Sequence, residues 1–270
     1  MTKAVRMMQE NMKLIDLVIE LVDARVPLSS RNPDIDELGK NKSRIVLLNK
    51  ADLADPACNR EWVGFFKEKG AYVLEINAKT GAGLKELHKL VQEACREKLE
   101  RDKKRGIVNR PVRAMVAGIP NVGKSTFINS FAGKACTKTG NKPGVTKGKQ
   151  WIRLDKGLEL LDTPGILWPK FEDQQVGLHL AWIGSINDEI LITEELAWKL
   201  LELLQELYPT AVSGRYGIEA CGTAEETLQE IARSRGCFRK GETLDTQKAA
   251  GILLEDFRSG RLGRMTLECP

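Results

Sequence analysis

The stretch GIPNVGKST, residues 118–126, constrains the fold of this chain more than any other feature. It has the spacing G-x-x-x-x-G-K-S, with an apolar run at 112–117 before it and a helical pattern from Lys124 onward. Glycines between a strand and a helix let backbone N–H groups surround a phosphate group, and the helix start adds a positive dipole. A chance glycine turn is the alternative, but the strand–loop–helix context favours a phosphate-binding loop.

Individual positions of this loop have separate expected roles. Lys124 should reach the β- and γ-phosphates of a nucleotide and take part in catalysis, and Ser125 should bind Mg²⁺. We expect the rest of the nucleotide-binding surface of the loop to come from residues on either side of these two: Pro120, Asn121, Val122, Gly123 and Thr126.

The motif Asp162-Thr163-Pro164-Gly165 follows a second apolar run, residues 158–161. An aspartate at a strand end, downstream of a phosphate loop, commonly holds Mg²⁺ through its water shell. Gly165 would let a backbone N–H group face the γ-phosphate and so contribute to catalysis. D-x-x-G alone is a weak, turn-like signal, but its place after the phosphate loop makes it a strong one.

A mobile segment that reaches Mg²⁺ and the γ-phosphate is expected between these two motifs. Thr146, in NKPGVTKG, is the candidate for this metal-binding and catalytic position, and Thr137 and Thr139 are the alternatives. Residues 134–156 hold seven lysines and arginines against Asp155 alone. A segment ordered by nucleotide could therefore dock on RNA phosphates in one state only, although a solvated loop is the plain alternative.

The motif Asn49-Lys50-Ala51-Asp52 predicts recognition of a guanine base. The carboxylate of Asp52 can accept two parallel hydrogen bonds, and guanine presents its N1–H and 2-amino groups side by side whereas adenine does not. Asn49 and Lys50 would brace the loop. A companion contact to the guanine oxygen is expected from the segment after the next strand: Asn77, Ala78 and Lys79. The alternative, a surface turn, does not explain both segments.

The order of these motifs predicts the architecture. Apolar runs typical of buried parallel strands lie at 14–24, 43–50, 71–78, 112–118 and 158–165, and helical patterns alternate with them at 59–70, 83–104 and 124–133. This alternation indicates an α/β domain with a mostly parallel sheet. Because the base-reading motif comes before the phosphate loop, we expect a circularly permuted P-loop GTPase domain over residues 1–177.

The remaining residues, 178–270, indicate a small all-α domain. Helical patterns occupy 189–209, 223–236 and 244–260, and the second opens with Thr223-x-x-Glu226, a capping box. Residues 1–177 contain 32 Lys+Arg and 22 Asp+Glu, while residues 178–270 contain 10 and 15. The basic excess of the first part suggests an anionic partner such as nucleic acid, or else a solvated basic surface.

Composition excludes several other classes of protein. No run of 18 or more apolar residues and no signal peptide is visible, so we expect a cytoplasmic protein with no membrane partner. The six cysteines form no C-x-x-C pair and are expected to be reduced thiols. Neither His88 nor His179 has a sequence-based claim to catalysis.

With this motif order the sequence resembles the circularly permuted ribosome-biogenesis GTPases of the YlqF type, also called ribosome biogenesis GTPase A. The matching segments run along nearly the whole chain: DARVPLSSRNP (23–33), NKADL (49–53), NAKTGAG (77–83), GIPNVGKST (118–126), PGVTKG (143–148), DTPGILWP (162–169) and DFRSGRLGRMTLE (256–268). The resemblance implies a GTPase, expected to be monomeric, that binds a late precursor of the large ribosomal subunit in the GTP state. Hydrolysis stimulated by that particle would release it.

The resemblance also implies that Asn121 helps hold K⁺ and that the C-terminal helices bind rRNA. Two departures bear on turnover. Ile166 stands where a Ras-like GTPase has the glutamine that orients water. The family's proposed catalytic histidine belongs to a Pro-Gly-His-Met segment, whereas this chain begins at Met1-Thr2-Lys3-Ala4, so no catalytic histidine is carried over.

Two other functions remain as alternatives at this stage. The first is a GTP-gated rRNA-binding module with negligible intrinsic turnover, which Ile166 favours. The second is a P-loop kinase or ATPase, which the N-K-A-D motif and the lack of a lid-like arginine cluster disfavour.

Overall fold

A computed structural model gives the fold over residues 9–107, 110–133, 150–154, 157–163, 173–186, 193–219 and 222–270. Six strands form a single sheet in its first part: β1 (Leu17–Asp23), β2 (Ser43–Asn49), β3 (Tyr72–Ile76), β4 (Val112–Ala117), β5 (Gln150–Arg153) and β6 (Leu158–Asp162). Four of the five strand pairings are parallel, and β5 alone runs antiparallel, beside β6. The expected α/β class with a mostly parallel sheet is confirmed.

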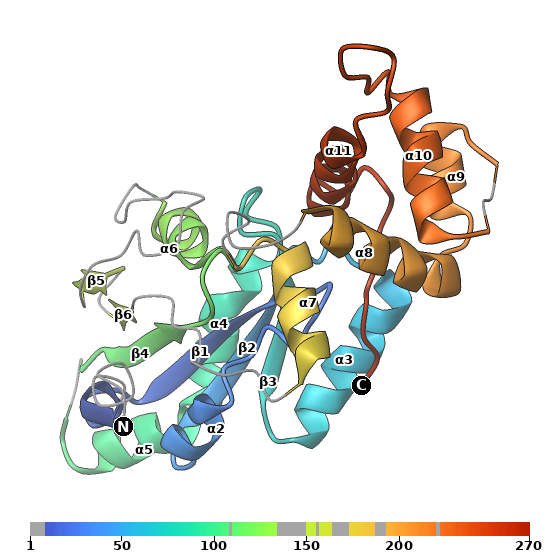
Figure 1. Ribbon diagram of the computed structural model, residues 1–270. Helices are drawn as coiled ribbons and strands as arrows, with labels where there is room; N and C mark the ends of the chain where they lie inside the picture. Colours follow the sequence, from blue (N-terminus) through green and yellow to red (C-terminus); the bar gives the residue numbers. More distant parts are fainter. Residues whose placement is uncertain are drawn as a thin grey trace. The chain divides into compact units, whose positions relative to one another are not determined.

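The order of the strands across the sheet is β3-β2-β1-β4-β6-β5 (Figure 1). The chain builds outward from β1 to β3, then returns to the middle with β4 and builds outward in the other direction. The point where the order reverses therefore lies between β1 and β4. In open parallel sheets, ligands bind beyond the carboxyl ends of the strands at such a reversal.

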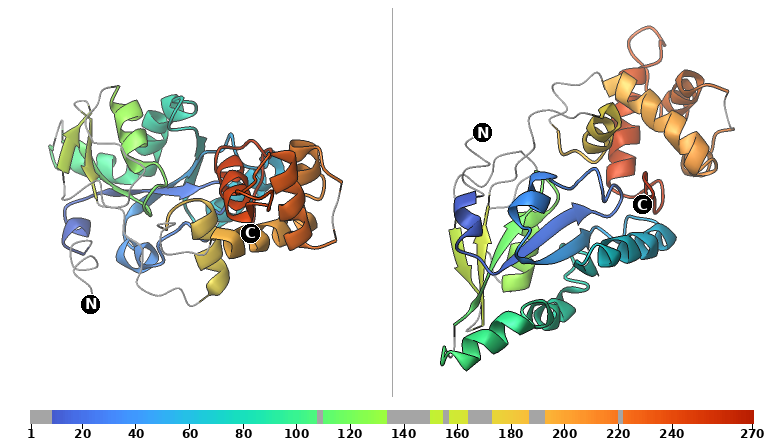
Figure 2. Two further views of the ribbon diagram at one scale, coloured as in Figure 1. Left: turned by 45° about the horizontal axis from the view of Figure 1, so that its top comes forward. Right: turned by 90° about the horizontal axis from the view of Figure 1, so that it is seen from below.

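The helices that join these strands cover both faces of the sheet (Figures 1 and 2). The helices that pack on it are α2 (Asp34–Leu38), α3 (Pro56–Glu68), α4 (Leu84–Ala94) and α6 (Lys124–Ala132), while α5 (Arg96–Lys104) follows α4 and buries no side chain. Right-handed crossovers in opposite directions place α2 and α3 on one face and α4 and α6 on the other. All seven residues of β1 are buried, as expected for a strand covered on both faces.

Each face of the sheet has its own packing. Trp62 and Phe66 of α3 are buried against Val22, Val46 and Leu48, whose side chains share one face of β1 and β2. On the α4 and α6 side, the His88 ring lies 4.6 Å from the Phe131 ring between centroids. The His88 side chain is itself exposed, so this ring pair lies at the edge of the packing.

One local expectation differs from the structure, and several short elements were not expected. The single helix expected over 83–104 is two helices, α4 and α5, divided at Cys95, where φ is −104° and ψ is 8°. The apolar stripe of α4 ends at Ala94 and α5 buries no side chain, so nothing keeps the two segments collinear against the sheet. Strand β5 and the short helices described below were not predicted.

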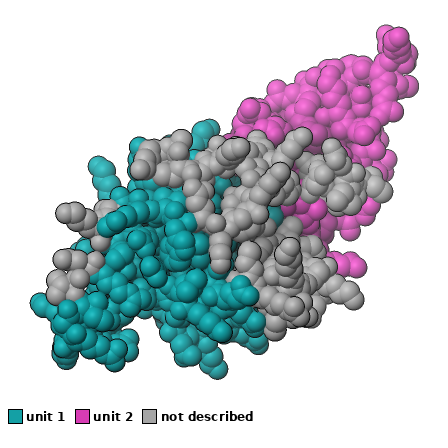
Figure 3. Space-filling model, turned by 90° about the vertical axis from the view of Figure 1, so that its left-hand side faces the viewer, with its two compact units in different colours: residues 1–170, 268–270 teal, residues 171–267 magenta. Residues whose placement is uncertain are grey.

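Contacts divide the chain into two compact units (Figure 3). Unit 1 comprises Met1–Lys170 together with Glu268–Pro270, and unit 2 comprises Phe171–Leu267. The boundary expected at 177/178 falls inside a helix of unit 2. Because the last three residues belong to unit 1, the chain passes from one unit to the other twice.

Unit 2 is built from helices α7 (Gln174–Trp182), α8 (Thr193–Leu207), α9 (Ala211–Tyr216), α10 (Ala224–Ser234) and α11 (Thr246–Arg258). Its described residues contain one isolated β-bridge, Phe238 to Leu244, and no strand. The predicted capping box is present, since the Thr223 hydroxyl accepts from the Glu226 N–H at 3.1 Å and the Glu226 carboxylate accepts from the Thr223 N–H at 3.0 Å.

The core of unit 2 follows the apolar stripes of α8, α10 and α11. Leu200 and Leu204 of α8, Ile231 of α10 and Leu253 of α11 are fully buried. His179 of α7 is also buried, with its ring 5.7 Å from that of Trp182. No helix in the described part of the chain is both long and apolar enough to cross a membrane.

Candidate nucleotide-binding site

The phosphate loop begins at the carboxyl end of β4, beside the reversal in strand order, and ends at the start of α6. Gly123 is the residue before α6 and has a φ of +102°, which favours glycine. A Cβ atom at Gly123 would lie 2.5 Å from Asn49 Nδ2, and one at Gly118 would lie 2.8 Å from the Leu21 carbonyl oxygen. Only glycine fits at these two positions, because β1 and β2 pass too close to leave room for a Cβ atom and because the backbone φ is positive.

Lys124 lies at the centre of this site. Its ammonium group donates hydrogen bonds to the carbonyl oxygens of Gly118 (2.8 Å) and Ile119 (2.9 Å), so the side chain curves back over the loop. Burial lowers the pKa of Lys124 to about 8, although the charge of Asp162 opposes the shift. A nearby phosphate would stabilise the charged form of this lysine.

Asp162, at the end of β6, supplies the acidic group of the site. Both carboxylate oxygens are buried and have no hydrogen-bond partner among the described residues. Burial raises the pKa of Asp162, with the Lys124 charge acting against it. Orphaned carboxylate oxygens beside a phosphate loop fit a hard cation or its water shell, so the residues present are compatible with Mg²⁺.

Asn49 joins the phosphate loop to the two segments expected to read the base. Its Nδ2 donates to the Val122 carbonyl oxygen (2.7 Å), and its Oδ1 accepts from the Ala78 N–H (3.0 Å). The Ser130 hydroxyl of α6 donates to the Ala78 carbonyl at 2.6 Å. The sequence expectation that Asn49 braces this region thus has a specific geometry, in which one buried amide connects three loops.

Lys50 adopts a left-handed backbone conformation, with φ of 59°. Its Nζ donates to Asp23 Oδ2 at 2.8 Å and lies 3.4 Å from the Asn121 carbonyl oxygen. Asp23, at the end of β1, also accepts from Nε (2.9 Å) and Nη2 (2.8 Å) of Arg25. Burial raises the pKa of the Asp23 carboxyl, but Arg25 and Lys50 outweigh it and hold the pKa well below its usual range.

No role for Asp23 or Arg25 in the site was predicted from the sequence. The signal was present, because an aspartate ends a strand whose carboxyl end lies beside the phosphate loop, in the quoted segment DARVPLSSRNP. What could not be derived from the sequence was the identity of the partner, since Lys50 lies 27 residues further along the chain.

The remaining predicted site residues divide into three groups. Asp52 and Lys79 are exposed at the carboxyl ends of β2 and β3, and the Asn77 side chain accepts from the Lys79 N–H (2.9 Å) and so shapes that turn. Pro120, Asn121, Val122, Ser125 and Thr126 lie in or beside the phosphate loop. Thr146 and Gly165, like the alternatives Thr137 and Thr139, lie outside the described residues.

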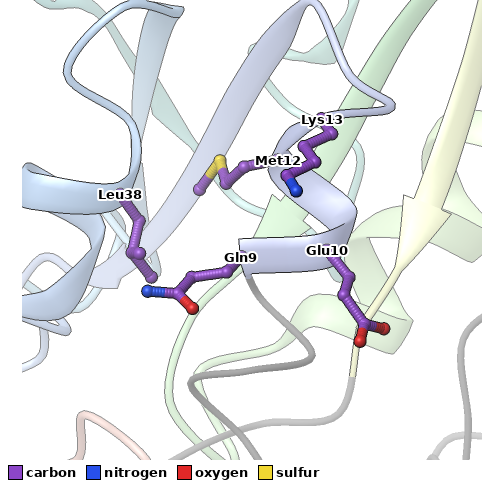
Figure 4. Close-up of a pocket in the computed structure, with 5 residues that line it drawn as sticks. All are labelled: Gln9, Glu10, Met12, Lys13 and Leu38. Atoms are coloured by element: carbon purple, nitrogen blue, oxygen red, sulfur yellow. The ribbon is translucent and has the colours of Figure 1, made fainter.

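A hollow of about 390 Å³ elsewhere on unit 1 is lined by Gln9, Glu10, Met12, Lys13 and Leu38 (Figure 4). Its residues precede β1 or end α2, so they lie toward the amino end of β1 rather than the carboxyl end. None belongs to the nucleotide motifs. The hollow is therefore separate from the candidate site.

The phosphate loop, the segment Asn49–Asp52 predicted to read guanine, and the acidic end of β6 meet at one edge of a mostly parallel sheet. This arrangement defines a circularly permuted P-loop GTPase. A family model described as 50S ribosome-binding GTPase matches residues 113–209. The matched part contains the phosphate loop and Asp162 but not Asn49–Asp52, as expected when permutation has moved the base-reading motif to the front.

Comparison with known proteins gives the particular family. Ribosome biogenesis GTPase A of Bacillus cereus is 48% identical over 271 residues, covering 100% of this chain and 92% of the relative. Mitochondrial ribosome-associated GTPase 1 of Mus musculus is 34% identical, with 99% and 88% covered. The structure of GNP-bound YlqF from Thermotoga maritima superposes with a TM-score of 0.72 at 29% identity, covering 100% of this chain and 99% of that one. The chain belongs to the ribosome biogenesis GTPase A family, and it is a GTP hydrolase.

Proposed function

We propose that this protein is a cytoplasmic assembly factor for the large ribosomal subunit, which binds a late precursor particle in its GTP state and leaves it when GTP is hydrolysed. Two findings together support this proposal. The chain holds a nucleotide site built from three separate segments, and relatives along its whole length are named for ribosome biogenesis. No membrane partner is part of the proposal.

The proposed nucleotide chemistry follows the geometry of the site. Lys124 and the backbone of the phosphate loop hold the phosphates, and Asp52 selects guanine by accepting from its two neighbouring N–H groups. Ser125, Thr146 and Asp162 hold Mg²⁺, which neutralises phosphate charge when it is bound. Gly165 offers its N–H to the γ-phosphate. The assignment of Asp162 to Mg²⁺ is supported by its two buried carboxylate oxygens, which have no hydrogen-bond partner among the described residues.

Asn121 is the proposed ligand for K⁺. It lies in the phosphate loop with φ of 59°, a left-handed conformation that asparagine adopts more readily than most non-glycine residues. A monovalent cation there would add positive charge to the transferring phosphate group, which an arginine supplies in other GTPases. Replacing K⁺ by Na⁺ should therefore slow hydrolysis, and an equal rate in both salts would remove K⁺ from the proposal.

Unit 2 is proposed to contact rRNA, and the connection between α10 and α11 supports this role. Phe238 is 51% exposed there, next to Arg239 and Lys240. The connection is held by backbone hydrogen bonds from Arg239 N to Thr243 O (2.8 Å) and from Asp245 N to Cys237 O (2.9 Å). An exposed aromatic ring beside cations can stack on an unpaired base while the cations meet phosphates.

Co-sedimentation with precursor and mature large-subunit particles tests the proposal. Binding should be tight with a non-hydrolysable GTP analogue, weak with GDP, and stronger for the precursor. Phe238→Ala combined with Lys240→Ala should weaken binding by about tenfold, from one lost stacked base and one lost phosphate contact. Glu225→Ala, on the exposed surface of α10, is the matched control. Equal binding with GTP analogue, GDP and no nucleotide would contradict the proposed cycle.

A further inference from the structure

The last three residues of the chain are part of unit 1, and Glu268 fixes them there. Its carboxylate accepts hydrogen bonds from the backbone N–H groups of Leu28 and Ser29, the latter at 2.9 Å, and from the Ser29 hydroxyl at 2.6 Å. Three donors converge on one carboxylate from a partner 239 or 240 residues away in sequence. This is a specific docking contact and not an incidental contact of a chain end.

The backbone of the same residue is held by α3. The indole Nε1 of Trp62, which is fully buried, donates to the Glu268 carbonyl oxygen at 3.0 Å. The neighbouring Cys269 lies beside Cys58, one helical turn before Trp62. The tail is therefore held by hydrogen bonds of both the backbone and the side chain of Glu268.

The loop that Glu268 holds, residues 24–33, is the loop between β1 and α2. Ser30, next to Ser29 and fully buried, accepts a hydrogen bond on its hydroxyl oxygen from the Asp23 N–H at 2.9 Å. The Asp23 carboxylate in turn binds the Lys50 ammonium group, which also faces the phosphate loop. Glu268 is thus connected to Lys50 by hydrogen bonds to Ser29, between Ser30 and Asp23, and between Asp23 and Lys50, with Ser29 and Ser30 joined by their peptide bond.

On the other side of the tail, Thr266 is fixed within unit 2. The Tyr208 hydroxyl donates to the Thr266 carbonyl oxygen (3.1 Å) and accepts from the Thr266 N–H (2.9 Å). Only Leu267 separates this anchor from Glu268. Two peptide units span at most about 7 Å, so the tail has almost no slack with which to absorb a shift of α8.

We propose that Glu268 is a positioning residue for the nucleotide site, acting through residues 28–30 and Asp23 on Lys50, and that the tail conveys displacement of unit 2 to the guanine-reading loop. This inference rests on the proposed function in one respect: binding to RNA is the event that would displace unit 2. By thermodynamic reciprocity, a nucleotide that changes the Lys50 loop also changes the affinity of unit 2 for its partner.

The test is the dissociation rate of a fluorescent GDP analogue from the isolated full-length protein, so it needs no ribosomal particle and is independent of the proposed particle-binding cycle. Glu268→Ala should accelerate release at least about fivefold, the lower range of typical coupling between sites. Glu268→Gln keeps an oxygen acceptor and should stay within about twofold of the parent. Glu255→Ala, an exposed glutamate of α11, is the control and should change nothing.

A double-mutant cycle separates positioning from simple destabilisation. If Glu268 acts through Lys50, Glu268→Ala should add no further acceleration to Lys50→Met, whereas independent effects would multiply. Tyr208→Phe, which removes both contacts to Thr266, should accelerate release as well. An unchanged rate in Glu268→Ala, or multiplicative effects with Lys50→Met, would overturn the proposal. Should Glu268→Ala not fold, Ser29→Ala carries the same two tests with a smaller expected effect.

Discussion

At the scale of single residues, the lowered pKa of Lys124 predicts that nucleotide affinity depends on pH. Its pKa of about 8 arises from burial, and bound phosphate must raise it by stabilising the charged form. Below pH 8 the lysine is charged both with and without nucleotide. Above pH 8 the free protein has lost this proton and must take it up on binding, so affinity for GDP should fall as pH rises, by up to about tenfold per unit.

Calorimetric titration with GDP between pH 7 and pH 9 measures this directly. Repeating the titration in two buffers with different ionisation heats counts the protons exchanged. We expect almost none at pH 7 and uptake approaching one at pH 9. Proton release at pH 9, or an affinity independent of pH, would show that Lys124 does not take up a proton when the nucleotide binds.

Asp52 is the residue proposed to select the base. Replacing its carboxylate by an amide in Asp52→Asn exchanges one acceptor oxygen for a donor, which no longer matches the paired N–H groups of guanine. Xanthine carries an oxygen where guanine carries its 2-amino group, so preference should shift toward xanthine nucleotides. Competition of GDP and XDP for the variant measures the shift, and retained selectivity for GDP would remove Asp52 from base recognition.

At the scale of secondary-structure elements, the start of α6 depends on Gly123. Gly123→Ala would place a Cβ atom 2.5 Å from Asn49 Nδ2 at a φ of +102°. Asn49 would have to leave Val122, and the link between phosphate loop and base-reading segments would open. We expect nucleotide affinity to fall at least about tenfold, together with a loss of about 1 kcal/mol or more in unfolding free energy.

Gly133, after the other end of the same helix, is the matched control. It also has positive φ (+66°), but a Cβ atom there would meet nothing within 4 Å. Gly133→Ala should share the loss in thermal stability and keep nucleotide affinity. Nucleotide titration and thermal unfolding of both variants separate backbone strain from damage to the site. Equal loss of affinity in both would mean that strain alone explains the effect.

Elements with strong local signals were predictable, and those defined by tertiary context were not. The strand before GIPNVGKST and the capping box at Thr223 followed from spacing and residue type. The break at Cys95 did not, because charged residues continue the helical pattern without showing that nothing lies beneath α5. Strand β5 has only four residues and depends on pairing with β6, which local sequence does not reveal.

The candidate site shows the same division. Asn49, Lys124 and Asp162 were placed by motif and lie where parallel strand ends meet. Asp23 was missed as a site residue because its role depends on a lysine from the neighbouring strand. The role of Glu268 was still less accessible, since it requires the last residues of the chain to return to a loop after the first strand.

At the scale of the whole molecule, circular permutation changes the order of segments in the sequence. The spatial order of the strands in the sheet still suits nucleotide binding. The phosphate-loop strand β4 stands between the base-reading strands and β6 with Asp162. The chain then continues into unit 2 and returns to unit 1 for its last three residues. Unit 2 is consequently joined to the GTPase unit at both of its ends, which suits a cycle in which particle binding and nucleotide state influence each other.

Steady-state GTP hydrolysis in K⁺ buffer, with and without isolated large ribosomal subunits, tests whether the protein is a ribosome-activated GTPase. We expect slow hydrolysis by the protein alone, since Ile166 replaces a water-orienting glutamine, and strong stimulation by the particle. Lys124→Ala should abolish both rates. An unstimulated rate, with GTP-dependent binding to the particle intact, would contradict the claim and show a GTP-gated binding module in place of a ribosome-activated GTPase.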